Sequence, residues 1–235
     1  MVADPKRMHP LDNIIWKALT TRQAEFAESF NQARRFMPEV SPLAAFSEPS
    51  PESYESLAEL VSPQGTIGLF LEAPYQPHAG WSFVAGAPMP EMVYEGNSVP
   101  LPRSSSDLEI VELSAADVPD MMALTALTKP GPFGKRTHEL GTYLGIRRDG
   151  KLIAMAGERL KIPGYTEVSA VCTHPEHTGH GYARLLMAEV MERILGRGET
   201  PLLHVREDNA RAIELYQRLG FRLRVLLHFA VLRKE

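Results

Sequence analysis

The 235-residue sequence has little cysteine, no long apolar run and no excess of charge of one sign. Its single cysteine, Cys172, excludes an intrachain disulfide and favours a reducing compartment. No stretch approaches the roughly 18 apolar residues of a membrane span, and the N-terminus lacks an apolar signal region. A formal net charge of −4 gives no electrostatic support for binding nucleic acid or a membrane surface. The sequence therefore predicts a cytoplasmic protein with neither of those partners.

Proline divides the chain, because most of its 19 prolines precede residue 108. Proline removes an N–H donor and fixes φ, so this half should contain short elements and many turns. The stretch 97–106 has the composition of a linker. We therefore expect an N-terminal domain over residues 1–96, a linker over 97–106 and a main domain over 107–235. For the first half, the pattern predicts a helix over 12–36, continuous or broken, a helix over 51–60 and strands over 66–71 and 92–94.

The second half alternates strands and helices more clearly. Asp149-Gly150 between two apolar runs is a strong hairpin signal over residues 142–160. The apolar spacing from Gly181 to Leu195 predicts an amphipathic helix. Further strands are expected over 108–113, 165–173, 200–205 and 221–232, the last as one strand or two, and further helices over 117–128 and 209–220. This order is typical of an α/β (α+β) fold.

Three histidines, His174, His177 and His180, lie three residues apart just before the predicted helix. Zinc sites need three or four converging ligands, and this spacing matches none of the common zinc motifs. Pro175 and Gly179 also oppose a helix that would align the imidazole rings. We therefore expect no metal, although a metal-binding module remains an alternative.

The same segment suits an anion better. A strand ends at Thr173, a loop contains Gly179 and Gly181, and a helix follows. The first turn of a helix leaves N–H groups unpaired, and the helix dipole makes that end positive. Glycine allows φ above zero and a close backbone approach, so successive amides can surround a phosphate. A tight turn without a ligand would use the same two glycines, so the loop alone does not decide.

Two blocks of the sequence carry a family resemblance. "TGHGYA", Thr178 to Ala183, resembles the Gln/Arg-x-x-Gly-x-Gly/Ala signature of the GNAT N-acetyltransferase superfamily. "NARAIELYQRLGF", Asn209 to Phe221, resembles that family's second block, Asn-x-x-Ala-x-x-x-Tyr-x-x-x-Gly-Phe. The resemblance covers roughly residues 107–235. It implies a mixed, mostly antiparallel twisted sheet flanked by helices, with a smaller N-terminal α+β domain. That domain loosely resembles the partner domain of double-domain members, including the glycine-N-acyltransferase-like branch.

The resemblance implies acetyl-CoA as donor, an amine as acceptor and no metal. It assigns coenzyme binding to the strand before the loop, the loop itself and the second block: Val171, Cys172, Thr173, Thr178, Gly179, His180, Gly181, Tyr182, Ala183, Arg184, Asn209 and Tyr216. Thr178 departs from the usual Gln or Arg, which predicts weaker phosphate binding by that side chain. Arg184 would supply the missing positive charge, or is an ordinary surface arginine.

The chemistry needs a base, an oxyanion donor and an acid. The resemblance makes Glu167, at a strand start, the candidate base, since a carboxylate facing a partly apolar cleft can have a raised pKa. The alternative is an ordinary exposed glutamate, and Glu158 is the reserve candidate base. The resemblance gives the oxyanion role to the Val171 amide, and such an amide contributes about a few kcal/mol.

The resemblance makes Tyr216 the candidate acid for the departing thiolate, and the alternative is a core tyrosine, because Ala212, Tyr216 and Leu219 share a helix face. Cys172 is rejected as a nucleophile, because an isolated cysteine in an apolar strand is usually a packing residue.

Several alternatives stay open. A coenzyme-binding regulatory or structural protein without turnover would share these motifs, and Thr178 favours that alternative. A homodimer is also open. The acceptor is not readable from sequence, because acceptor pockets depend on loops with no fixed signature. A small-molecule amine is the expected acceptor class.

Overall fold

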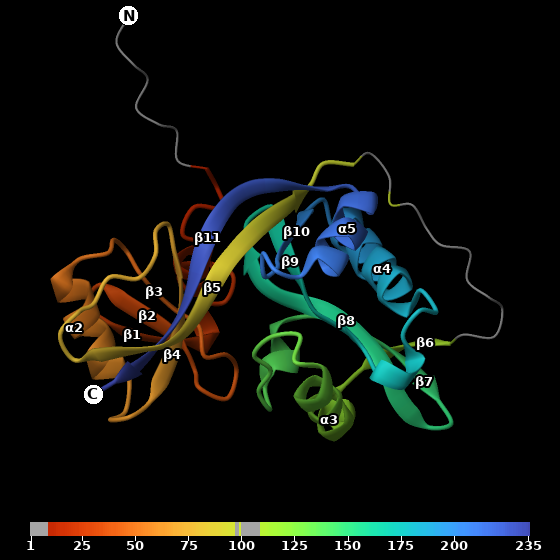
Figure 1. Ribbon diagram of the computed structural model, residues 1–235, viewed down its shortest axis with the longest axis horizontal. Coiled ribbons are helices and arrows are strands. Elements are labelled where there is room, and N and C mark those ends of the chain that lie inside the picture. The colour runs from red at the N-terminus through yellow and green to blue at the C-terminus, as the bar shows by residue number, and fades with distance from the viewer. Residues whose placement is uncertain (1–8, 97–98, 100–108) are drawn as a thin grey trace, which may run out of the picture.

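The structure, a computed structural model, describes residues 9–96, 99 and 109–235. A large sheet of eight strands runs through the molecule beside a small sheet of three, and helices cover both (Figure 1). In this part of the chain, none of the helices has the length and hydropathy needed to span a bilayer. The predicted linker, 97–106, lies outside the described residues except for Val99.

The start of the chain differs from the helix expected over residues 12–36. Helix α1 covers only Ile14–Thr20, and a hairpin of β1 (Ala27–Phe30) and β2 (Ala33–Phe36) follows. Asn31 in the two-residue hairpin turn has a φ of 44°. Asparagine tolerates this left-handed conformation, which two-residue hairpins require. The helix prediction is therefore wrong beyond α1, because turn chemistry outweighs the helical spacing of apolar residues.

The helix and strand predicted over residues 51–60 and 66–71 are confirmed. In α2 (Pro51–Leu60), the Ser50 hydroxyl accepts a hydrogen bond from the Ser53 N–H at 3.2 Å, and a proline opens the first turn. This is a favourable N-terminal cap. Helix α2 packs on the three-stranded sheet, whose order is β1-β2-β3 with β3 at Ala44–Phe46.

The eight-stranded sheet has the order β4-β11-β5-β10-β9-β8-β7-β6. Its strands are β4 Thr66–Leu71, β5 Trp81–Tyr94, β6 Ile110–Leu113, β7 Tyr143–Arg148, β8 Lys151–Ile162, β9 Tyr165–Thr173, β10 Thr200–His204 and β11 Phe221–Lys234. Every neighbouring pair is antiparallel except β9 and β10, which are parallel. The predicted fold class, a mixed and mostly antiparallel sheet with flanking helices, is confirmed.

Strand β5 is much longer than the predicted 92–94. Its stretch Gly86 to Pro90 argues against a central strand, because proline cannot donate to a ladder. The proline carbonyls are used instead: Pro88 accepts from the Glu207 N–H and Pro90 from the Val205 N–H. Strands β4 and β5 both pair with β11, so one sheet joins the two halves of the chain. The proposed division at residues 96 and 107 stays a prediction.

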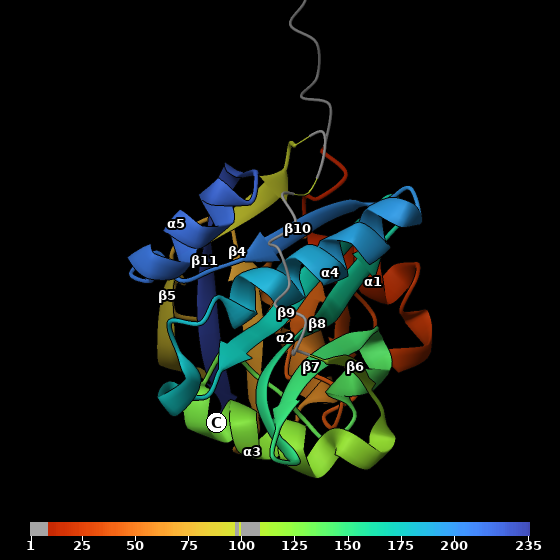
Figure 2. The same ribbon diagram turned by 90° about the vertical axis from the view of Figure 1, so that its right-hand side faces the viewer.

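Helices cover the two faces of the large sheet. Figures 1 and 2 show α4 (Tyr182–Gly196) on one face and α3 (Val118–Thr128) on the other. Helix α4 buries Leu186, Val190 and Ile194 completely against the sheet, as its apolar spacing predicted. Helix α5 (Ala210–Arg218) lies beside β11. Short 3-10 turns are η1 Ala24–Phe26, η2 Ala115–Asp117, η3 Thr137–Leu140 and η4 Pro175–His177.

Candidate active site

Two parallel strands separate in the middle of the large sheet. Strands β9 and β10 pair over three residues each, from Thr200 opposite Tyr165 to Leu202 opposite Glu167. Strand β9 then continues without β10 to Thr173. Past the paired segment, the facing edges of both strands carry backbone N–H and C=O groups that a neighbouring strand would normally satisfy. The separation therefore opens a cleft that can hydrogen-bond an extended ligand.

A β-bulge reshapes β9 at this cleft. Met155 pairs with Cys172 and Gly157 with Ser169, so Ala170 and Val171 together oppose a single residue of β8. Ala170 has a φ of 52°, which is unusual for a residue with a side chain. A bulge leaves its extra residue outside the ladder and is common beside active sites. Both bulge residues line the cleft, as the predicted oxyanion role of the Val171 amide requires.

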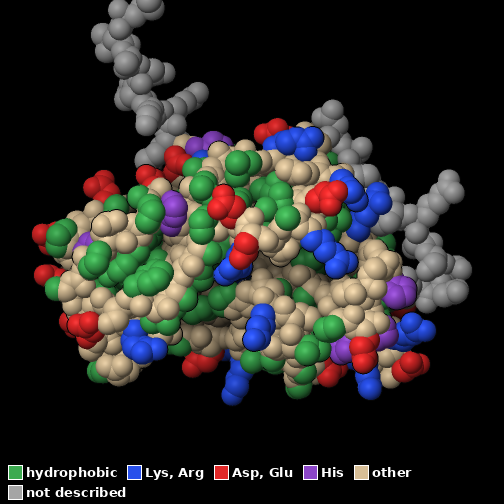
Figure 3. Space-filling view, in the orientation of Figure 1, with side chains coloured by type: hydrophobic (Ala, Val, Ile, Leu, Met, Phe, Trp, Pro, Cys, Tyr) green, Lys and Arg blue, Asp and Glu red, His purple; other side chains and the backbone are tan. Residues whose placement is uncertain are grey.

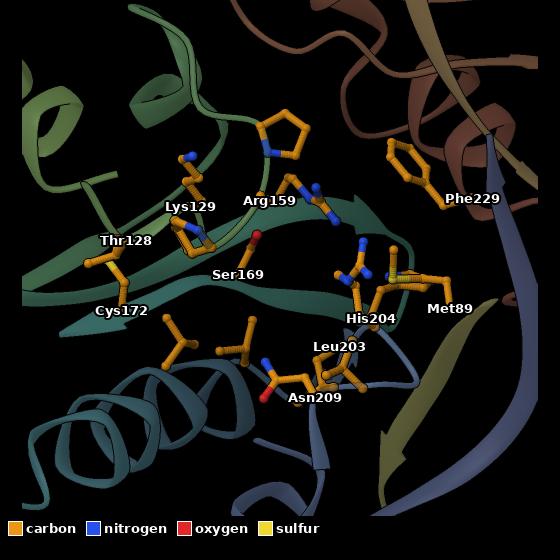
Figure 4. A pocket seen from close by; sticks show the side chains of 18 of the residues that line it. Met89, Thr128, Lys129, Arg159, Ser169, Cys172, Leu203, His204, Asn209 and Phe229 are labelled. Atoms are coloured by element: carbon orange, nitrogen blue, oxygen red, sulfur yellow. The ribbon is translucent and has the colours of Figure 1, made fainter. Parts of the chain in front are cut away.

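The cleft holds a cavity of about 530 Å³. Figure 4 shows Arg159, His204, Met89 and Phe229 gathered at one end and Cys172 with Thr128 at the other. Figure 3 shows this face of the molecule hollowed near its middle, with hydrophobic, basic and acidic side chains around the hollow. The N-terminal half supplies part of the wall through Leu43, Phe70 and Met89. The cavity therefore depends on both halves of the chain.

The glycine loop lies between β9 and α4. Gly179 and Gly181 have φ values of 86° and 80°, and a Cβ on either would point into open space. Among the described residues, no acceptor pairs with the N–H of Gly179, His180 or Gly181. Helix α4 begins directly afterwards, and the Leu185 N–H donates a hydrogen bond to the Gly181 carbonyl oxygen. Free amides and a positive helix end fit a phosphate group.

The three histidines are part of this loop's own hydrogen bonding. His174 Nδ1 accepts from the Glu176 N–H at 3.3 Å, and His180 Nδ1 lies 3.2 Å from the His177 carbonyl oxygen. The His180 ring stacks on Tyr182, with ring centroids 5.4 Å apart. Across residues 9–96, 99 and 109–235, no three His, Cys, Asp or Glu side chains gather as metal ligands would.

Tyr216 and Asn209 reach the cavity from α5. Both line it, and the Asn209 side chain accepts from the Ala212 N–H at 3.2 Å, so Asn209 caps the N-terminus of α5. Burial raises the pKa of the Tyr216 phenol to about 12. The phenol therefore keeps its proton at neutral pH and can give it to a basic leaving group.

Glu167 lies among cations rather than in an apolar setting. Its Oε1 is 2.6 Å from Arg159 Nη2 and 2.7 Å from His204 Nδ1; its Oε2 is 2.8 Å from Arg159 Nε and 3.3 Å from the Leu160 N–H. Burial alone would raise its pKa, but Arg159 and His204 outweigh burial and hold the pKa of the carboxyl well below its usual range. The expectation of a raised pKa is therefore wrong.

His204 links Glu167 to a second buried carboxylate. Its Nε2 lies 3.2 Å from Glu91 Oε2, and Glu91 also pairs with Arg224. Burial alone would lower the His204 pKa, but Glu167 and Glu91 outweigh it, so the pKa is raised. Arg224 in turn binds Asp12 at 2.8 Å. A chain of oppositely charged pairs thus runs from the partly exposed Asp12 to the cleft.

Comparison with known proteins decides the family. The model of the FR47-like protein family matches residues 143–229. A solved structure from Novosphingobium aromaticivorans, described as an acetyltransferase from the GNAT family, is 38% identical, covers 97% of this chain and 100% of its own, and superposes with a TM-score of 0.88. The chain belongs to the GNAT family of acetyltransferases.

Two curated acetyltransferases match a smaller part of the chain. The mycothiol acetyltransferase of Brachybacterium faecium is 33% identical over 111 residues, 45% of this chain and 34% of the relative. The N-alpha-acetyltransferase RimI of Mycobacterium tuberculosis is 37% identical over 82 residues, 34% of this chain and 51% of the relative. These matches span between a third and a half of the relatives' lengths. The glycine-N-acyltransferase branch stays a prediction.

The other predicted residues of the GNAT motifs take varied positions. Val171, Cys172 and Thr173 line the cavity, whereas Tyr182 is buried in the core and Arg184 is exposed. Thr178 bonds the Pro175 carbonyl, and Ala183 lies half-buried in the first turn of α4. Burial raises the pKa of the Cys172 thiol to about 11, in keeping with a packing residue. The coenzyme-binding roles remain predictions.

Glu158, the reserve base, is buried away from the cavity lining and pairs with Arg197 at 2.8 Å and Lys161 at 2.7 Å. Sequence reasoning missed Arg159 and His204, which line the cleft of this GNAT chain. The sequence did carry a signal for Arg159: it is a charged residue within an apolar strand. Because burying an unpaired charge is costly, such a residue is expected to have a specific partner or role. No local sequence pattern indicated that His204 would line the cleft.

Proposed function

We propose that this protein transfers an acetyl group from acetyl-CoA to a small-molecule amine by direct attack while both are bound. The observation that carries the proposal is the cleft between β9 and β10, which ends at the glycine loop before α4. Acetyl-CoA would supply a thioester whose carbonyl carbon accepts an amine. The single cysteine further supports a reducing, cytoplasmic setting.

The chain offers groups for each part of the coenzyme. Backbone amides from Gly179 to Ala183 suit the diphosphate, and the exposed edge of β9 from Val171 to Thr173 suits the extended pantetheine arm. Asn209 at the start of α5 faces the same cavity. Because these donors belong to the backbone, the loss of the usual Gln or Arg at Thr178 weakens binding without abolishing it.

For the reaction, Tyr216 holds a proton at its phenol oxygen for the leaving sulfur, and the bulge amide of Val171 stabilises negative charge on the carbonyl oxygen. The four contacts of Glu167 fill its lone-pair sites, so we propose that it positions Arg159 and His204 in place of the predicted base role. No carboxylate of the described residues lines the cavity, and we propose that water accepts the amine proton.

The test is turnover and coenzyme binding by the wild type and Tyr216→Phe. Acetyl-CoA should raise the melting temperature, by an amount worth about 2.7 kcal/mol at 100 times its Kd. Thiol release against an amine panel should be about 10²-fold slower in Tyr216→Phe, with coenzyme affinity retained. Tyr165→Phe is the matched control, because Tyr165 lies at the far end of β9 and outside the cavity lining. Coenzyme binding without transfer to any amine would instead support a binding protein without turnover.

The names of the curated relatives do not choose the acceptor. One name refers to mycothiol and the other to N-alpha acetylation, so they point to different acceptors. The acceptor therefore has to be argued from the cavity of this chain.

A further inference from the structure

One edge of a buried guanidinium is open to the cavity. Arg159 uses Nε and Nη2 to grip Glu167 side-on, at 2.8 Å and 2.6 Å. Its side chain is only 10% exposed, yet Arg159 lines the cavity, and Nη1 has no partner among the described residues. Glu167 thus fixes the plane of the guanidinium group, while the edge formed by Nη1 and Nη2 remains available. A second planar, two-oxygen ligand matches that edge, because arginine binds carboxylates in a forked geometry.

The charged side chains among the residues that line the cavity are all basic. They are Lys129, Arg159, His204, Arg206 and Arg211, and the described lining contains no Asp or Glu. Glu167 and Glu91 are held by their own partners behind the cavity wall. Lys129, at the end of α3, has no ion pair among the described residues and adds an uncompensated positive charge. An anionic group at Arg159 is therefore favoured electrostatically.

The wall next to Arg159 is apolar and aromatic. Phe70 and Phe229 meet edge to face, with ring centroids 5.7 Å apart, and Phe70 also contacts the His204 ring at 4.4 Å. Leu43 and Met89 complete this wall. Figure 4 shows Phe229, Met89 and Arg159 around the same end of the cavity. Apolar rings beside a fixed guanidinium suit a ligand that carries a carboxylate next to an apolar group.

We infer that the acceptor is a small amine bearing a free carboxylate beside an apolar group, as in a hydrophobic amino acid, and that Arg159 determines this specificity. The inference rests on the proposed function, since it assigns the acceptor end of the same cleft. Glu167 acts through Arg159 as a positioning residue. The apolar wall from the N-terminal half then holds the acceptor's side chain.

The experiment compares ligands that differ only in the carboxylate. Transfer is measured with L-phenylalanine and L-phenylalaninamide, and binding of N-acetyl-L-phenylalanine and its amide is measured by calorimetry without coenzyme. The wild type should bind the acid at least tenfold more tightly than the amide. Arg159→Lys keeps the charge opposite Glu167 but lacks the second forked edge, so the preference should shrink at least tenfold. Arg147→Lys, a change at the surface pair with Asp117 and Asp120, is the matched control.

The outcomes separate this inference from the proposed function. Equal or tighter binding of the amide, no binding of either compound, or an unchanged preference in Arg159→Lys would overturn the inference. Failure of the proposed function would appear as no binding of acetyl-CoA, which the calorimetric comparison does not use. Arg159→Lys retains a cation beside Glu167, so we expect it to fold. Its melting temperature, compared with that of Arg147→Lys, checks this.

Discussion

Replacing Glu167 by glutamine tests whether this carboxylate positions cations or acts as a base. Glutamine has nearly the same shape but removes the charge that faces Arg159 and His204. Both partners are then left buried, with side chains 10% and 1% exposed. Removing one partner of a buried ion pair typically costs about 3–5 kcal/mol, because the remaining charge loses its compensation in a low-dielectric site.

That cost is a large part of the stability of a protein this size. Native proteins are stable by about 5–15 kcal/mol, and a chain of this length loses about 2–4 °C in melting temperature for each kcal/mol. We therefore expect Glu167→Gln to melt about 6–20 °C below the wild type. Adding Arg159→Met should recover part of the loss, because both charges are then gone.

Chemical denaturation with urea measures the effect directly. Glu28→Gln is the matched control: Glu28 pairs with Arg35 at 2.8 Å but is 42% exposed, so its loss should cost about 0–1 kcal/mol. If Glu167→Gln were as stable as Glu28→Gln while its acid limb in the pH–rate profile disappeared, the positioning role would be refuted and the base role restored.

Three further changes test other parts of the structure. Because the folded-state pKa of His204 is raised above 6.5, the stabilising positive charge of His204 is fully present below pH 6.5 and is lost as pH rises through the folded-state pKa. The difference in unfolding free energy between the wild type and His204→Gln should therefore become smaller as pH rises. A difference that does not change with pH would contradict this. Leu186→Ala, at a fully buried position of α4, should cost about 2–5 kcal/mol in urea unfolding. Asn209→Ala should cost about 1 kcal/mol through the lost cap, and a larger rise in coenzyme Kd than in Asp208→Ala would support its contact with the coenzyme.

Local sequence signals predicted much of this fold. The Asp149-Gly150 turn and the apolar stripe of α4 each gave the correct element. Most of strand β5 could not be recognised, because its glycine and prolines oppose a strand locally and its ladders are provided by the distant strands β11 and β10. Long-range pairing thus overrode local preference.

The candidate site divides in the same way. The glycine loop and Tyr216 were found because their residues lie within short blocks with a fixed spacing. Arg159 and His204 belong to β8 and β10, and only the sheet order brings them together across β9. The environment of Glu167 was misjudged for this reason: both cations that lower its pKa come from other strands. Its charge state depends on tertiary structure rather than on its own strand.

Calorimetric titration of CoA into Gly181→Ala and Gly164→Ala tests most directly whether loop amides hold the coenzyme. Both glycines have a φ of 80° with open space at the Cβ position, so both substitutions strain the backbone equally. Only the Cβ at Gly181 would stand where a diphosphate approaches the amides. We predict at least tenfold weaker binding for Gly181→Ala and wild-type binding for Gly164→Ala. Equal affinity in the two variants, or no binding by the wild type, would contradict the account.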